Sequence, residues 1–126
     1  MSVADDPSRY DVEVKRLLNR INKLNGQEDL VVFYGSSSVR LWVSLKEDLA
    51  PMNTLNLGFG GSSFEWCIHH FQTLFENINP KEVALYVGDN DLGNGIPKES
   101  LVGSYLILRD LIWSRFPDVI IHYISI

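Results

Sequence analysis

The sequence predicts an α/β fold in which helices cover a parallel sheet. Short apolar runs typical of buried strands alternate, from residue 6 to the end, with segments whose apolar residues recur at helical spacing. Strands separated by helices pair in parallel, because each connecting helix returns the chain to the same end of the sheet. With 126 residues, 45% of them hydrophobic, the chain is predicted to form a single domain over residues 1–126.

The N-terminal half is predicted to hold two helices and two strands. The first helix covers residues 6–24, and Gly26 favours its end. Residues 30–34 form an unbroken apolar run, which is typical of a strand buried on both faces. A short helix over 39–49 and a strand over 54–57 follow.

The C-terminal half is predicted to add two helices and two strands. Ser62 and Glu65 match a capping box that starts the third helix. A strand over 82–87, a helix over 97–116 and a strand over 119–126 complete the pattern. The last strand is very apolar for a sheet edge, and bare edges invite pairing with another chain. We therefore expect a domain truncated after its fourth strand, and a homo-oligomer formed through that strand.

Composition excludes several classes of function. The formal charge of −5, with Lys and Arg scattered, argues against nucleic-acid binding, which needs a clustered basic face. No apolar run reaches the ~18 residues of a membrane span, and the N-terminus does not resemble a signal peptide. Cys67 is the one cysteine and falls on the apolar side of its helix, so we expect a core residue in a cytoplasmic protein.

Three polar or glycine-rich turns follow predicted strands, at residues 35–38, 58–63 and 88–91. The carboxyl ends of parallel strands meet at one edge of a sheet, where ligands bind in α/β folds. The sequence therefore predicts a ligand site built from these three turns.

The residues of these turns suit acyl transfer. Ser37 stands at a predicted helix start, where free backbone amides favour developing negative charge. Gly60 and Gly61 have no side chain, so a backbone amide can reach a substrate oxygen, and the Asn90 side-chain amide can donate to the same oxygen. Together they describe a hydroxyl nucleophile beside an oxyanion hole.

At these turns the sequence resembles the SGNH, or GDSL-like, serine hydrolase family. Residues 33–42, 56–61 and 88–91 are similar to its first three sequence blocks, in the same order, and the resemblance runs from about residue 28 to the end. It implies a flavodoxin-like three-layer α/β/α fold and hydrolysis of an ester or O-acyl (acetyl) group in a small ester or an acylated carbohydrate or lipid. It implies no metal and no organic cofactor.

The resemblance also implies roles for individual residues. Ser37 matches the nucleophile; its own amide, the Gly61 amide and the Asn90 side chain match the oxyanion-hole donors. Ser36 stands where most family members have an aspartate that orients the loop. The substrate-binding residues expected around this site are Ser36, Trp42 and Asp89.

The Asp-x-x-His block that supplies the family's catalytic aspartate and histidine has no match in this chain. A serine hydroxyl is a weak nucleophile without an adjacent base, and removing triad members costs on the order of 10⁴ to 10⁶ in turnover. We expect the chain alone to be nearly inactive. A degenerate, non-catalytic domain that binds a ligand or partner and a truncated gene product are the alternatives.

Other polar residues have simpler interpretations. His69 and His70 are expected on a helix surface, and His122 lies inside the last strand, so none is an obvious base. Asp89 and Asp91 lack the spacing of a calcium loop, and we expect no metal there. The glycine-rich turn at 58–63 is also a weak candidate for a phosphate site.

Overall fold

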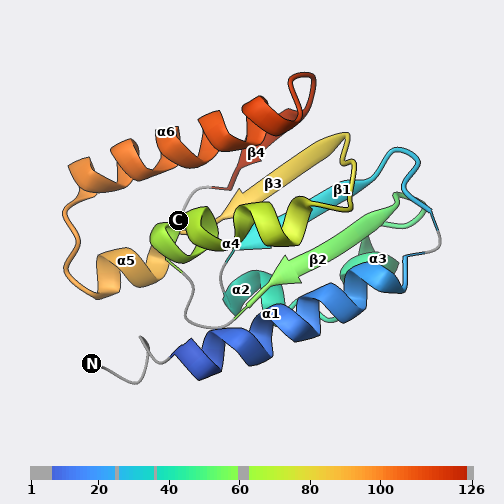
Figure 1. The fold of residues 1–126 in the computed structure, drawn as a ribbon, viewed down its shortest axis with the longest axis horizontal. Helices are drawn as coiled ribbons and strands as arrows, with labels where there is room; N and C mark the ends of the chain where they lie inside the picture. Colours follow the sequence, from blue (N-terminus) through green and yellow to red (C-terminus); the bar gives the residue numbers. More distant parts are fainter. Residues whose placement is uncertain (1–6, 25, 36, 60–62, 125–126) are drawn as a thin grey trace.

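The structure, a computed structural model, describes residues 7–24, 26–35, 37–59 and 63–124, with side chains except at positions 7–11, 37, 89 and 90. Four parallel strands form one sheet in the order β2-β1-β3-β4. The predicted α/β fold is therefore confirmed (Figure 1). In chain order the elements are α1 (Pro7–Asn22), β1 (Val31–Gly35), α2 (Ser37–Arg40), α3 (Leu45–Asp48), β2 (Thr54–Gly58), α4 (Phe64–Phe75), β3 (Glu82–Tyr86), α5 (Asp89–Gly93), α6 (Lys98–Arg115) and β4 (Ile120–Tyr123).

Helices lie on both faces of the sheet. The connection from β1 to β2 crosses the sheet in one direction, while those from β2 to β3 and from β3 to β4 cross it in the other. Because such crossovers are right-handed, the first places α2 and α3 on one face, and the others place α4 and α6 on the opposite face. The α1 helix joins the face of α4 and α6, since its buried residues belong to the same core.

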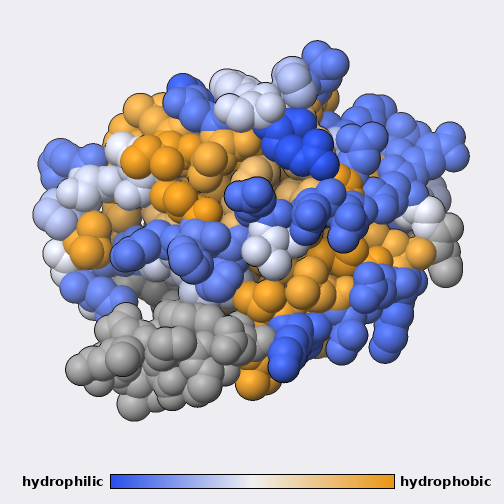
Figure 2. Space-filling model, viewed as in Figure 1, coloured by the Kyte–Doolittle hydropathy of each residue, from blue (hydrophilic) through white to orange (hydrophobic). Residues whose placement is uncertain are grey.

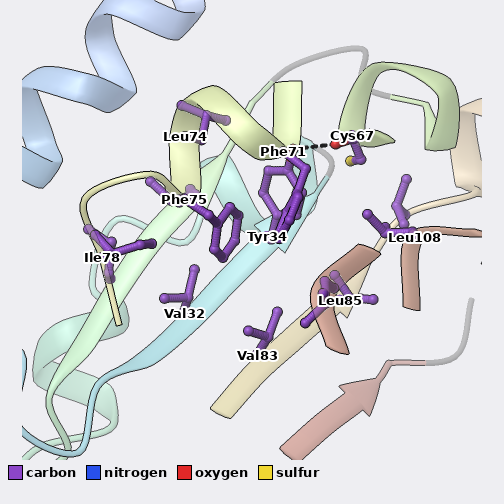
Figure 3. Close-up of a cluster of buried hydrophobic side chains, with 14 of the residues drawn as sticks. Val32, Tyr34, Cys67, Phe71, Leu74, Phe75, Ile78, Val83, Leu85 and Leu108 are labelled. Carbon is purple, nitrogen blue, oxygen red and sulfur yellow. Dashed lines mark hydrogen bonds between the residues drawn. The ribbon is translucent and has the colours of Figure 1, made fainter. Parts of the chain in front are cut away.

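The larger core fills the space between the sheet and α1, α4 and α6 (Figure 3). Val32 and Tyr34 of β1 and Leu85 of β3 point into it, and all three are fully buried. The Tyr34 hydroxyl donates a hydrogen bond of 2.8 Å to the Cys67 carbonyl on α4. Burial raises the pKa of both the Tyr34 hydroxyl and the Cys67 thiol. Cys67 is thus a core residue, as the sequence predicts.

A smaller core lies on the opposite face, under α2 and α3. It contains Val31, Phe33, Val39, Leu45 and Ala84. The neighbouring Trp42 ring packs edge-on against Phe33, with 5.7 Å between ring centroids.

The single helix predicted over 39–49 is wrong: the chain forms two short helices, α2 and α3, with turns between them. Asn56 of β2 explains the break. Its side-chain amide donates to the carbonyls of Val39, at 2.7 Å, and Trp42, at 3.4 Å. These carbonyls would otherwise accept the next hydrogen bonds of a continuous helix.

Three boundaries also differ from those predicted. The N-cap of α4 is Ser63, whose hydroxyl accepts from the Trp66 amide at 3.2 Å; the predicted cap, Ser62, lies outside the described residues. The turn expected at 88–91 opens directly into the short helix α5. The last strand is shorter than predicted and pairs with β3 over Ile120–Tyr123.

Candidate active site

The strands β2, β1 and β3 end level with one another. Gly35, the last residue of β1, is in register with Gly58 of β2 and with Tyr86 of β3. The α2 helix begins two residues after Gly35, and α5 begins immediately after Gly88. The carboxyl edge of the sheet therefore brings the first and third predicted turns, and the start of the second, to one place (Figure 1).

Two glycines at this edge allow backbone segments to approach each other closely. Gly35 has a φ of +144°, and a Cβ at this position would collide with the Tyr86 carbonyl oxygen. A Cβ on Gly58 would collide with the backbone nitrogen of Arg40 in α2. Larger residues at either position would push apart the segments that carry the candidate nucleophile and oxyanion-hole donors.

The Asn56 side chain connects the first turn to the second by hydrogen bonds. Besides its bonds to the Val39 carbonyl in α2 and the Trp42 carbonyl after it, its Oδ1 accepts a hydrogen bond of 2.8 Å from the Gly58 amide. One amide side chain thus fixes the end of β2 relative to the helix that begins at Ser37.

The Asp91 carboxylate connects the third turn to the end of the second by hydrogen bonds. It lies on α5 with 7% of its surface exposed, and its carboxylate accepts from the Phe64 amide at 3.3 and 3.4 Å. Phe64 is the first residue of α4, where unpaired amides and the helix dipole favour a negative charge. Sequence reasoning considered Asp91 only as a turn residue or cation ligand and missed this link.

The predicted site residues are described to different extents. Ser36 and Gly61 lie outside the described residues. For Ser37, Asp89 and Asn90 the structure gives the backbone, which places them at the starts of α2 and α5. Their assignments remain predictions. Trp42 is fully described: it is half-buried, and its indole Nε1 donates to Asp48 at 2.6 Å.

An apolar cavity of about 540 Å³ lies at the same end of the sheet, beside α5. Leu92, two residues beyond Asn90, contributes to its wall, as does Tyr123 at the end of β4. The remaining lining residues come from the starts of α4 and α6: Phe64, Lys98, Leu101, Val102 and Tyr105. Its size is typical of a small-molecule pocket.

No protein-family model matches the chain, and no curated protein matches its sequence. Solved structures do resemble it. A Streptococcus pneumonia protein described as a platelet activating factor superposes with a TM-score of 0.79 at 14% identity, covering 92% of this chain. A Bacteroides fragilis protein described as an acylhydrolase gives 0.67 at 18% identity and 98% coverage, and a Bacteroides thetaiotaomicron GDSL-like lipase gives 0.62 at 21% and 97%. The chain has the GDSL-like hydrolase fold.

The chain spans about half the length of these GDSL-like structures. The aligned part is 54% of the Streptococcus protein and 58% of each Bacteroides protein. The comparison confirms the predicted fold, while the activity of this chain is a matter for proposal.

The histidines of this domain lie away from the three turns in sequence and on other elements. His69 is exposed on α4, as predicted, whereas the neighbouring His70 is half-buried with its ring 4.2 Å from the Trp66 ring centre. His122 on β4 pairs with Glu82 at 2.8 Å. Among the residues that the structure describes, no group of three or more metal-ligating side chains gathers, and no helix is long and apolar enough to cross a membrane.

Proposed function

We propose that this domain belongs to a serine hydrolase that cleaves ester or O-acyl groups, with Ser37 as the nucleophile. The observation that carries the proposal is the level ending of β2, β1 and β3, with two glycines in close backbone contact at the shared edge. This arrangement supports a hydroxyl and several N–H donors acting on one substrate carbonyl.

In this mechanism the Ser37 Oγ attacks the acyl carbonyl and its proton passes to a base. The tetrahedral oxyanion accepts hydrogen bonds from the amides of Ser37 and Gly61 and from the Asn90 side chain. The base then returns the proton to the leaving alcohol, and water releases the acyl group by the same steps in reverse order. Ser36 and Asp89 flank the reacting groups in sequence and are proposed to contact the substrate.

The cavity beside α5 is a suitable place for the acyl group. Leu92 belongs to the same short helix as Asn90, which supports binding of the acyl group against this apolar wall. A pocket lined mainly by apolar side chains favours a hydrocarbon acyl chain over a charged one.

The proposed reaction needs a base that the described part of this chain does not supply in an evident way. His122 is paired with Glu82, and His69 is exposed on the middle of α4. We therefore propose that activity requires an additional segment carrying an Asp-x-x-His block, supplied in the same polypeptide or by a partner.

Ester turnover tests this proposal. The chain is extended with a C-terminal segment carrying the Asp-x-x-His block, and hydrolysis of a chromogenic acetate ester is compared with that of the same protein carrying Ser37→Ala. We expect the serine variant to lose at least about 10³-fold in kcat. Asn90→Ala should lose about 10² to 10³-fold. Equal rates for the parent and the Ser37 variant would contradict the proposal.

A non-catalytic domain that binds a second copy of itself is the alternative, and the exposure of β4 favours it. The side chains of Ile120, Tyr123 and Ile124 are 39 to 50% exposed at the edge of the sheet. Two copies related by a two-fold axis could pair their β4 edges antiparallel and continue one sheet through both.

Sedimentation equilibrium tests this alternative. The chain should form a dimer, and Ile120→Lys with Ile124→Lys should restore a folded monomer. A folded monomer in the parent chain at tens of micromolar would exclude self-association of this kind.

A further inference from the structure

The outer edge of β2 carries a second feature, which lies outside the three turns of the proposed hydrolase site but shares Trp42 and the α2 helix with it. On α1, Arg16 and Arg20 are one helical turn apart and donate, each at 2.8 Å, to the carbonyls of Gly58 and Asn56. Two residues of strand and four residues of helix advance the chain by similar lengths, about 6 to 7 Å, so the spacings match. These arginines cover the free edge of the sheet.

A cavity of about 470 Å³ continues along this edge toward the start of β2. Its lining residues come from α1, from the α2–α3 segment and from β2. Its floor is formed by Thr54, Leu55 and Asn56. This position is near the middle and beginning of β2, away from the carboxyl edge where the three turns meet.

The cavity is positively charged although the whole chain carries a formal charge of −5. Its lining includes four cationic side chains and one anionic side chain: Arg20, Lys23, Arg40 and Lys46, against Glu47. Four of the eleven Lys and Arg residues of the chain thus line this one cavity. Such a concentration of one charge favours a ligand of the opposite charge.

Nearby acids do not neutralise this charge fully. Glu13 pairs with Arg16 at 2.9 Å and approaches Arg40 at 4.0 Å. Burial and the neighbouring Arg16 and Arg40 charges lower the pKa of Arg20 from its usual value, and Glu13 only partly opposes them. Within the described part of the chain, Lys23 and Lys46 form no ion pair.

Thr54 provides a polar group of its own beside the cavity. It is one of the lining residues, only 5% of its surface is exposed, and its Oγ1, which is shielded from solvent, has no hydrogen-bond partner among the described residues. A buried hydroxyl without a partner is costly, and a rotation about χ1 would let it donate a hydrogen bond to an anionic oxygen in the cavity.

The remaining wall is apolar. Trp42 and Val43 lie on one side, and Leu24 of α1 lies on the other. A ligand that is anionic throughout would leave this surface without a partner, whereas an apolar or aromatic group attached to the anion would cover it.

We propose that this cavity binds a small organic phosphate, a phosphate monoester whose apolar body packs against Trp42. Cations from two separate segments surround the phosphate and suit a dianion, with Thr54 as a further donor. Arg40 connects the cavity to the α2 helix, so the bound phosphate contacts the same helix that begins at Ser37.

Isothermal titration calorimetry of the full chain in roughly 0.1 M salt tests this proposal, with phenyl phosphate as the probe. We expect saturable binding of one molecule per chain. Inorganic phosphate, which lacks the apolar body, and benzyl alcohol, which lacks the charge, should each bind at least about tenfold more weakly. Equal affinity for inorganic phosphate would contradict the organic ligand class, and absence of phenyl phosphate binding would overturn the site.

Two pairs of lysine variants test whether phenyl phosphate binds in this cavity or is only attracted by the positive charges of the chain in general. Lys23→Gln with Lys46→Gln should weaken phenyl phosphate binding by at least about tenfold. The control, Lys15→Gln with Lys81→Gln, makes the same change in net charge away from the cavity and should alter affinity by less than about twofold. Equal losses in the two pairs would overturn the proposal.

Thr54→Val tests the hydroxyl separately. The replacement keeps the shape of the side chain and removes a group that has no partner in the unliganded chain. We expect unchanged or increased thermal stability without ligand, together with about threefold to tenfold weaker phenyl phosphate binding. Unchanged affinity in this folded variant would contradict the assignment of Thr54 to the site.

Discussion

The two sides of β3 differ in how completely the sheet is enclosed. On one side, β1 is buried along its whole length between the two helix layers. On the other, β4 is buried mainly through Ile121, which faces α6, while Ile120 is 50% exposed. The predicted nucleophile and oxyanion-hole segments follow the enclosed strands. The frame of the candidate site therefore depends little on β4, and among the described residues no further strand pairs with β4.

Some hydrophobic residues outside the core lie on the same side as β4. Figure 2 shows hydrophobic surface over the α6 half of the face that carries α1, α4 and α6, and a second hydrophobic area on its α1 half. Val102, Leu106 and Ile107 of α6 are 38 to 57% exposed. An exposed apolar helix side next to a bare strand edge is typical of a surface that is covered in a larger assembly.

Truncating one residue on β3 and one on β4 measures how much less enclosed β4 is. Leu85→Ala removes a fully buried side chain and should lower the free energy of unfolding by about 2–5 kcal/mol. Ile120→Ala removes a half-exposed one and should cost less than about 1 kcal/mol. Urea denaturation of both variants gives the values. Comparable losses would show that β4 is enclosed as fully as β3.

One added methyl group at Gly35 should disrupt the close approach of the β1 and β3 backbones at the carboxyl edge of the sheet. Gly35→Ala places a Cβ against the Tyr86 carbonyl at a φ of +144° and should destabilise the domain by about 3 kcal/mol. The matched control is Gly103→Ala on α6, where a Cβ has open space; it should stabilise by about 0.5–1 kcal/mol. Opposite signs in urea denaturation are expected, and equal effects would contradict the backbone geometry at Gly35.

The link between the second and third turns can be tested at Asp91. Asp91→Ala leaves the Phe64 amide at the start of α4 without its acceptor and should cost about 1–3 kcal/mol of unfolding free energy. Asp91→Asn keeps an acceptor oxygen and should recover part of this loss. Amide hydrogen exchange at the first turn of α4 should rise in the alanine variant, and unchanged exchange there would contradict the bracing role.

The sequence predicted the strands and the larger helices because their apolar periodicity reflects burial on the sheet. It failed where a single side chain from a distant segment decides local structure. Asn56 interrupts the predicted 39–49 helix from 14 to 17 residues away, and Asp91 caps a helix that begins 27 residues earlier. Such contacts leave no periodic signal. The basic cavity was missed for the same reason, because Arg20, Lys23, Arg40 and Lys46 are scattered in sequence and meet only in the fold.

The enclosed region should also respond to alkaline pH. Because burial raises the pKa of the Cys67 thiol, the unfolded chain releases this proton from about pH 8.5 while the folded chain retains it. The stabilisation is present below that pH and should decline by about 1.4 kcal/mol per pH unit above it. Cys67→Ala should show a shallower decline between pH 8.5 and 9.5, where Tyr34 is still protonated in both states. Parallel curves would contradict the burial of the thiol.

The smallest effect is expected at the ion pair that joins β4 to β3. Glu82 and His122 lie 2.8 Å apart, but the His122 side chain is 53% exposed, so water and salt screen the attraction. Glu82→Gln should change the free energy of unfolding by no more than about 0.5 kcal/mol, and 0.5 M salt should reduce even that difference. A loss above about 1 kcal/mol would mean that this pair, rather than the packing of Ile121 against α6, holds β4 on the sheet.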